Sequence, residues 1–295
     1  MYDIEKLTVA KTVEEAIAAL VADESAVVIS GGSDVLIKIR EGKLAGSNLV
    51  SIHDIAALKG VTMQEDGTIA IGPATSFSHI TQNEIIQKHI PVLGWAVDQV
   101  GGPQIRNIGT IGGNVCNGVT SADSASTLFA LCAKLELTGP KGKRVLPIGE
   151  FYVSAGRTVR AHDEILTAIY ITKENYENCG AHYIKYAQRN AMDIATLGCA
   201  VNVRLSADKK TVAEVRLAYG VAGPVPMRCP EAEKSITGMA ISEKMFDTIA
   251  EKAAQEVNPR TSWRASKEFR LQLVQELARR VLKQAILNAG GKIDA

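Results

Sequence analysis

The spacing of apolar residues predicts one helix and two strands in the first 55 residues of the chain. Residues 12–15, Thr-Val-Glu-Glu, match a capping box, and apolar residues follow at helical spacing through Leu20. Short apolar runs at residues 26–29 and 48–52 then predict buried strands. This part of the chain is therefore expected to form a unit of its own.

From residue 61 the pattern changes to short β-prone runs and helices that are separated by turn residues. Asp66-Gly67 lies between two such runs and predicts a hairpin. Helical spacing covers residues 76–88, and Pro91 opens a helix that ends before Gly101. The remaining predicted elements are a short helix at 122–133 and strands at 134–138, 144–148 and 164–171.

The polar region at residues 171–181 predicts a domain boundary. Strands are expected beyond it at 182–187, 195–205 and 212–221, followed by helices at 230–237, 242–257 and 266–288. Strands followed by helices, without β-α-β alternation, indicate an α+β domain.

Two glycine-bearing segments are the candidates for a ligand-binding site. Residues 30–34, Ser-Gly-Gly-Ser-Asp, follow the strand at 26–29, and residues 101–123 hold six glycines with almost no charge. Glycine permits positive φ and has no Cβ, so consecutive N–H groups can form an anion-binding concavity. Such a concavity suits a pyrophosphate.

Each segment also has an ordinary structural interpretation. Residues 30–34 match neither a Walker A loop, a GxGxxG fingerprint nor a nucleophile elbow, and taken alone they indicate a plain turn. Asp123 by itself fits the N-cap of a helix. Asn114 could satisfy the backbone of a local turn.

Composition and charge exclude several function classes. The formal net charge of +1 argues against capture of nucleic acid or of an anionic membrane. The N-terminus lacks an apolar signal segment, and no stretch approaches about 18 uninterrupted apolar residues. Five dispersed cysteines without a Cys-x-x-Cys pair favour free thiols in a reducing compartment over an iron–sulfur centre, and five histidines show no metal spacing. We therefore expect a cofactor-holding protein rather than a hydrolase.

The sequence resembles a known family along nearly its whole length. Beside the glycine segments, the resemblance lies in residues 103–107 (Pro-Gln-Ile-Arg-Asn), 118–124, 189–193 and 262–270. These motifs are similar to those of the FAD-binding medium subunits of molybdenum hydroxylases, most of all those of xanthine dehydrogenases.

The resemblance implies an α+β fold of two domains. Residues 1–175 would form a PCMH-type (vanillyl-alcohol-oxidase-like) FAD-binding domain, with subdomains at about 1–55 and 56–175. Residues 176–295 would form a domain of the CO dehydrogenase flavoprotein C-terminal type.

The resemblance also implies a set of FAD-binding residues. They are Val27, Val28, Ile29, Ser30, Gly31, Gly32, Ser33, Asp34, Val100, Gly109, Thr110, Ile111, Gly112, Gly113, Asn114, Asp123, Ile165, Leu166 and Lys185. Thr110 would face the phosphates, Asp123 would lie near the adenosine side, and Lys185 would contact the flavin. Val100 stands where some relatives carry an aromatic residue that stacks on adenine. Removal of Lys185 is expected to alter the behaviour of the flavin with little loss of folding.

By the same resemblance the chain is an electron-transfer subunit. Electrons released when a molybdopterin-carrying large subunit hydroxylates xanthine or hypoxanthine would pass through [2Fe–2S] centres on a small subunit to FAD, and leave to NAD. The segment 189–193 would affect the access of NAD. No catalytic side chain and no metal ligand are expected on this chain, nor contact with nucleic acid or membrane, and the expected location is the cytoplasm. The alternatives are a related hydroxylase subunit for another N-heterocycle or aldehyde, a self-contained flavin oxidase, and a non-catalytic assembly subunit.

Overall fold

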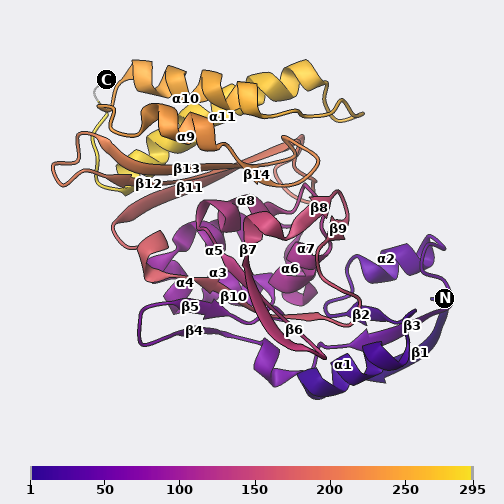
Figure 1. Cartoon of the computed structure of the whole chain (residues 1–295). Helices are drawn as coiled ribbons and strands as arrows, with labels where there is room; N and C mark the ends of the chain where they lie inside the picture. The colour runs from indigo at the N-terminus through magenta and orange to yellow at the C-terminus, as the bar shows by residue number, and fades with distance from the viewer. Residues whose placement is uncertain (1, 294–295) are drawn as a thin grey trace.

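The computed structural model describes residues 2–293 and shows three packed units in chain order (Figure 1). The first unit holds β1 (Ile4–Val9), α1 (Val13–Ala22), β2 (Val27–Ile29), α2 (Val35–Arg40) and β3 (Ser47–Ser51). Its strands form a parallel sheet in the order β1-β3-β2. The termini of the predicted domains, residue 1 and residues 294–295, lie outside the described residues.

The predicted cap at Thr12 is confirmed at the start of α1. Thr12 Oγ1 accepts a hydrogen bond from the Glu15 amide at 3.1 Å, while the Glu15 carboxylate accepts from the amide of Lys11, the residue before the cap, at 2.8 Å. The strand β1 was not predicted, because most of its side chains are exposed and three of its six residues are charged or hydroxylated.

The second unit is built around an antiparallel sheet in the order β4-β5-β10-β6-β7. Its strands are β4 (Val61–Met63), β5 (Ile69–Ile71), β6 (Lys134–Gly139), β7 (Gly142–Pro147) and β10 (Ile165–Ile171), with the small pair β8 (Tyr152–Ser154) and β9 (Arg157–Thr158) beside them. Its helices are α3 (Phe77–Gln82), α4 (Glu84–His89), α5 (Pro91–Val97), α6 (Pro103–Ile108), α7 (Ile111–Cys116) and α8 (Asp123–Ala130). The 3-10 turns are η1 (Ala56–Leu58), η2 (Ile148–Glu150) and η3 (Lys173–Asn175).

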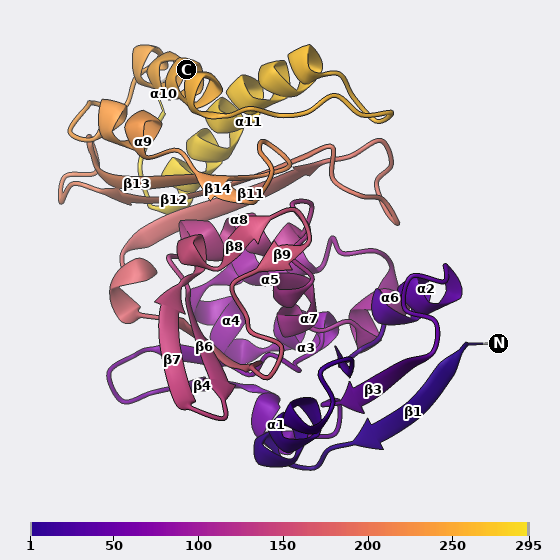
Figure 2. The ribbon, with the colours of Figure 1, turned by 45° about the vertical axis from the view of Figure 1, so that its right-hand side comes forward.

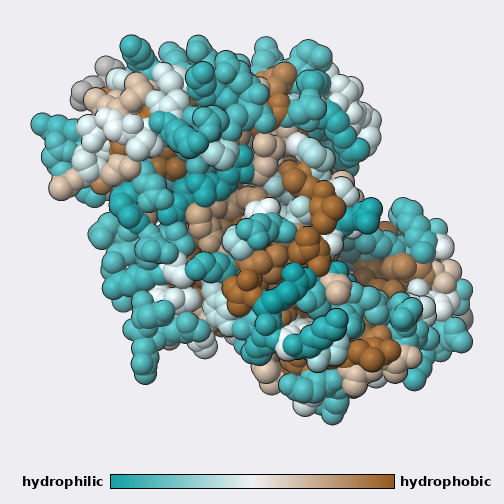
Figure 3. All heavy atoms as spheres, in the orientation of Figure 1, coloured by the Kyte–Doolittle hydropathy of each residue, from teal (hydrophilic) through white to brown (hydrophobic). Residues whose placement is uncertain are grey.

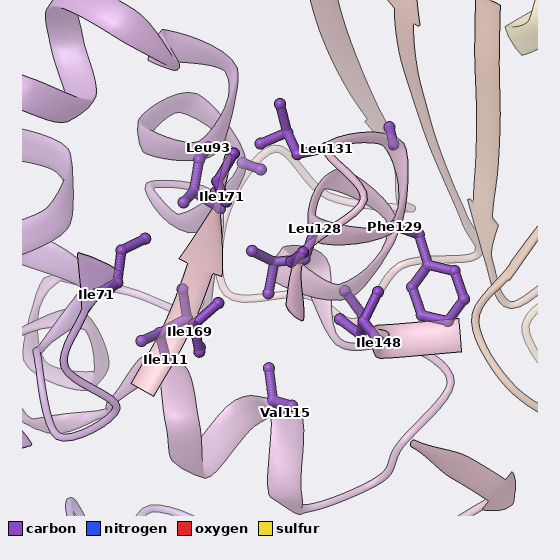
Figure 4. Close-up of a cluster of buried hydrophobic side chains, with 14 of the residues drawn as sticks. Ile71, Leu93, Ile111, Val115, Leu128, Phe129, Leu131, Ile148, Ile169 and Ile171 are labelled. Carbon is purple, nitrogen blue, oxygen red and sulfur yellow. The ribbon is translucent and has the colours of Figure 1, made fainter. Parts of the chain in front are cut away.

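The core of this unit joins the middle strand to the glycine-rich helices. One cluster of buried side chains joins Ile169 and Ile171 of β10 to Leu128 of α8 and to Ile111 and Val115 of α7 (Figure 4). Each of these side chains is buried. Because α7 is fixed by this packing, the glycines that it contains have a fixed position as well.

The third unit is a sheet with helices on one face. Its sheet has the order β11-β12-β13-β14, with β11 (Cys179–Tyr186), β12 (Leu197–Leu205), β13 (Val212–Gly220) and β14 (Met227–Arg228). Its helices are α9 (Pro230–Ile236), α10 (Glu243–Glu256) and α11 (Lys267–Asn288). The β12 strand contacts α11 on one face and α8 of the second unit on the other (Figure 1), so nearly all of its residues are buried. The predicted order of strands and helices in this unit is confirmed.

The glycine-rich stretch differs from its prediction. No helix was predicted within residues 101–121, but this stretch contains the short helices α6 and α7. Gly102 and Gly109 flank α6 in extended conformation, and Thr110 caps α7. The high glycine content argues against helices in this stretch. Hydrogen bonds between residues 73–77 and residues 109–112 hold the stretch in place, and they cannot be predicted from local sequence.

Within residues 2–293, the helices are all too short or too polar to cross a membrane.

Candidate functional site

A cavity of about 580 Å³ lies where all three units contribute wall residues. Its volume is in the range of ligand sites for small molecules and cofactors. The wall combines residues 27, 28 and 30–34 of the first unit, residues 110, 112–114 and 121–123 of the second and residues 192–194 of the third. In Figure 3 the molecular surface is hollowed between the N-terminal unit on the right and the body of the molecule.

The segment that follows β2 presents unpaired amides to this cavity. Within residues 2–293, the N–H groups of Gly31, Gly32, Ser33 and Asp34 have no acceptor. Gly32 has a φ of +75°, a conformation that side-chain-bearing residues rarely adopt. Four consecutive free amides in a cavity wall supply hydrogen-bond donors of the kind that a phosphate group needs.

Gly31 is also required by the packing of the two glycine segments. A Cβ at this position would lie 1.9 Å from the carbonyl oxygen of Ile108, the last residue of α6. This carbonyl belongs to the backbone and cannot rotate away like a flexible side chain. The first segment therefore depends on glycine for its close approach to the second.

The amides of the second segment are engaged inside the protein, which corrects the expectation that both segments offer bare N–H groups. The Ile111 and Gly112 amides donate to the carbonyls of Thr75 (3.1 Å) and Pro73 (2.8 Å). The Gly113 amide donates to Thr110 Oγ1 at 3.2 Å, so this hydroxyl caps α7. Thr110 Oγ1 in turn donates to Ser30 Oγ at 3.3 Å and links the two segments.

Lys38 adds a positive charge to the same wall. It follows the free amides by one turn of α2, and its Nζ donates to Asn117 Oδ1 at 2.9 Å. Both residues line the cavity. An ammonium group beside unpaired amides strengthens the attraction of this wall for an anion.

Arg160 and Glu164 line the cavity at the start of β10. The Glu164 carboxylate accepts two hydrogen bonds of 2.7 Å from Arg144 and one of 2.8 Å from the Ala161 amide. The Arg144 guanidinium is the main reason why the pKa of Glu164 is lowered. Glu164 is therefore ionised at neutral pH.

A buried ion pair joins the wall residue Asp123 to Lys185. Lys185 Nζ donates to Asp123 Oδ2 at 2.8 Å and to the carbonyl oxygen of Gln99 at 2.9 Å, while Tyr183 Oη donates to Asp123 Oδ1 at 2.9 Å. The side chains of Asp123 and Lys185 are each only 7% exposed. Burial raises the pKa of Asp123, and the two donors oppose this shift.

Asp123 and Lys185 contact each other directly, and of the two only Asp123 lines the cavity. Their positions at the adenosine side and at the flavin remain predictions. Asp123 is the first residue of α8, and its side chain bonds Tyr183 and Lys185 instead of capping the helix, so the N-cap interpretation is wrong. The alternation of β11 brings Tyr183 and Lys185 to the same face, from which they reach α8.

The connection between β11 and β12 contributes the last part of the wall. The Met192 amide donates to the Gly101 carbonyl at 3.2 Å, and the Met192 sulfur occupies the space that a Cβ on Gly102 would need. Asp193 Oδ2 accepts from the Arg189 amide at 2.9 Å, which holds the connection in shape. Through Met192, Asp193 and Ile194 the third unit thus forms part of the cavity wall.

Most of the residues expected at the site line this cavity. Those that do are Val27, Val28, Ser30, Gly31, Gly32, Ser33, Asp34, Val100, Thr110, Gly112, Gly113, Asn114, Asp123, Ile165 and Leu166. Ile29, Gly109, Ile111 and Lys185 are not part of the wall. Ile111 is buried in the core, and Lys185 acts through Asp123.

Sequence reasoning missed several wall residues, among them Lys38, Asn117, Arg160 and Glu164. For Lys38 a signal existed, since it stands one helical turn beyond residues 30–34. Arg160 and Glu164 lie near no recognisable motif. They reach the cavity because β10 pairs with β5 and β6, which are distant in sequence.

The wall also contains a thiol, Cys116. Burial raises the pKa of Cys116 to about 11, so it stays protonated at neutral pH and is a poor nucleophile. Among residues 2–293 there is no group of three or more His, Cys, Asp or Glu side chains that could hold a metal ion.

Comparisons with known proteins identify the class to which this fold and cavity belong. Residues 3–173 match the family model described as the FAD binding domain in molybdopterin dehydrogenase, and residues 182–285 match the CO dehydrogenase flavoprotein C-terminal domain. The chain belongs to the FAD-binding subunits of the molybdenum hydroxylase family, as its motifs indicated.

Individual relatives cover nearly the whole chain. It is 43% identical over 293 residues to the xanthine dehydrogenase FAD-binding subunit of Escherichia coli O157:H7, which covers 99% of this chain and 100% of the relative. It is 31% identical to the carbon monoxide dehydrogenase medium chain of Afipia carboxidovorans, over 93% of this chain and 94% of the relative. Among solved structures, carbon monoxide dehydrogenase from Hydrogenophaga pseudoflava aligns with a TM-score of 0.92 at 26% identity, over 98% of this chain and 99% of that one.

Lys38→Met tests the role of the charge in the cavity wall. We expect FAD to bind about fivefold more weakly, because a partly exposed charge contributes about 1 kcal/mol to the binding of a phosphate. The difference should shrink at high salt, where screening weakens the attraction. Titration of the flavin-free chain with FAD measures both effects. Lys43→Met, which removes an exposed charge beyond α2, is the matched control, and equal affinities for the two variants would remove Lys38 from the site.

Proposed function

We propose that this chain is the FAD-carrying subunit of a xanthine dehydrogenase-like complex in the cytoplasm. In this proposal a molybdopterin-carrying subunit hydroxylates a purine, a [2Fe–2S] subunit carries the electrons to the FAD site of this chain, and NAD is the final acceptor. The identity of 43% over the full length of both chains is the observation that carries this proposal.

The residues of the cavity fit FAD. The free amides of residues 31–34 and the Lys38 ammonium would hold the diphosphate, since both supply donors to an anion. Ile165 and Leu166, which are buried at the start of β10, offer an apolar surface to a ring system. The absence of side chains at Gly31 and Gly32 leaves room for the backbone to approach the ligand.

When bound, FAD supplies the exchange between one-electron and two-electron carriers that links iron–sulfur centres to NAD. The protein residues bind and orient it. Asp123, fixed by Tyr183 and Lys185, presents an immobile carboxylate to one end of the cavity. Met192 and the residues beside it cover that cavity from the third unit, where they would control how closely a nicotinamide approaches.

Anaerobic titration of the purified complex tests both the acceptor and the substrate. We expect NADH to bleach the visible absorption of the oxidised flavin, because reduction of the flavin by NADH reverses the proposed final step. Xanthine should bleach it as well, whereas nicotine and an aldehyde should leave it unchanged. A flavin that xanthine reduces but NADH does not would contradict NAD as the acceptor. A flavin that only another heterocycle or an aldehyde reduces would contradict the purine substrate.

A further inference from the structure

An exposed turn before α11 carries a tryptophan and an arginine at its tip. Two backbone hydrogen bonds between Ser262 and Ala265, of 3.0 and 3.2 Å, close this turn. Trp263 is 77% exposed, and the Arg264 guanidinium lies 4.3 Å from the centre of its ring. In Figure 2 the segment that leads into α11 projects beyond the sheet, on the same side as the connection between β11 and β12.

A buried charge holds this turn in place. Arg270 is only 2% exposed, and it donates to Ser262 Oγ at 2.8 Å and to the Thr196 carbonyl at 2.7 Å. Burying a guanidinium is costly unless a partner compensates its charge. The buried Arg270 guanidinium thus fixes the exposed turn, although its burial is costly in free energy. A loop that is only solvated does not require such a contact.

Several positive charges around the tip form no ion pair. None of the ion pairs within residues 2–293 includes Arg260, Arg264, Lys267 or Arg270, and Glu268 is the one carboxylate that acts on Lys267 from the neighbouring position. The pKa of Arg270 is lowered by burial and by the nearby Arg260 and Arg264 guanidinium groups. This face therefore attracts an anionic partner.

We infer that the turn at residues 262–265 is a docking knob for the subunit that delivers electrons to the flavin, and that this subunit presents an acidic rim around an apolar pocket. Tryptophan and arginine are the residue types that most often dominate binding at protein interfaces. A tip that the chain holds rigid loses little conformational freedom when it binds. The inference rests on the proposed function.

The position of the knob favours this occupant over others. Gln188 Nε2 donates to the Arg264 carbonyl at 3.2 Å, so the knob is attached to the connection whose residues 192–194 line the cavity. A partner seated there lies beside the cavity, where an electron donor is required. The tip is convex, whereas small ligands such as nucleotides bind in concave sites. A symmetric contact with a second copy would bring the same uncompensated cations together.

The test uses the tagged full chain co-expressed with the [2Fe–2S] and molybdopterin subunits of its complex. We expect Trp263→Ala to weaken binding of the [2Fe–2S] subunit by about thirtyfold, as for a tryptophan at the centre of an interface. Arg264→Glu should weaken it by about tenfold or more, and most strongly at low salt. Val153→Ala and Lys252→Glu, which change an exposed apolar residue and an exposed cation elsewhere, should leave binding unchanged.

The FAD content of each variant separates this inference from the proposed function. A wild-type chain without FAD would contradict the proposed function itself. If the variants keep full FAD and bind the [2Fe–2S] subunit as wild type does, the docking inference is wrong. It is also wrong if the variants lose only the molybdopterin subunit, change only self-association, or raise only the KM for NAD.

Discussion

Gly31→Ala is expected to weaken FAD binding at least about tenfold, so that the purified chain loses most of its flavin. The added Cβ would meet the Ile108 carbonyl oxygen at 1.9 Å, and the backbone of one glycine segment must move away from the other. Overpacking of this kind costs about 1–3 kcal/mol, and the movement displaces the free amides that follow. Flavin absorbance per mole of purified chain measures the loss.

Gly149→Ala is the matched control for this substitution. Only a ring carbon of Phe129, at 3.9 Å, lies near the Cβ that this change adds. It should therefore retain the flavin content of the wild type. If Gly31→Ala also retained full flavin with unchanged affinity, the contact between the two glycine segments would not define the cofactor site.

Lys185→Met is expected to lower the free energy of unfolding by about 3–5 kcal/mol, because it leaves the buried Asp123 carboxylate without its counter-ion. This result would replace the expectation from sequence that removal of Lys185 has little effect on folding. Burial explains why the effect on stability is large: both side chains are only 7% exposed, so water cannot solvate the carboxylate that Lys185 leaves behind. Urea denaturation of the flavin-free chain measures the change without a contribution from bound cofactor.

A double substitution distinguishes the lost charge pair from lost packing. Asp123→Asn combined with Lys185→Met removes both charges, and we expect it to recover at least about 1 kcal/mol relative to Lys185→Met alone. Lys234→Met, which removes an exposed ion pair with Glu231, should change stability by less than about 0.5 kcal/mol. A loss of similar size for Lys185→Met and Lys234→Met would contradict the importance of the buried pair.

Much of the fold could be predicted from local patterns. The cap at Thr12, the hairpin at Asp66-Gly67 and the succession of strands and helices after residue 179 all depend on neighbouring residues, and the structure confirms them. The parallel strand β1 and the helices α6 and α7 depend on partners far along the chain. Their residues carry weak local preferences, so the sequence could not reveal them.

The candidate site shows the same division. Residues 30–34 could be selected because glycines after a buried strand are a local signal, and they do line the cavity. The contact of Asp123 with Tyr183 and Lys185 joins residues about 60 positions apart, and no spacing rule predicts it. Similarly, the hydrogen bonds that occupy the amides of Ile111 and Gly112 come from the fold of residues 73–75. The assignment of these residues to FAD contacts remains a prediction.

The cavity has a consequence for the order of events during biosynthesis. Its wall begins with Val27 and ends with Ile194, so a ribosome must have released the first strand of the third unit and the segment after it before the wall is complete. Domains generally fold as units in the order of their synthesis. The first two units can therefore be folded while the pocket is still open on one side. Stable binding of the flavin is consequently expected only after residue 194 and the segments before it have left the ribosome.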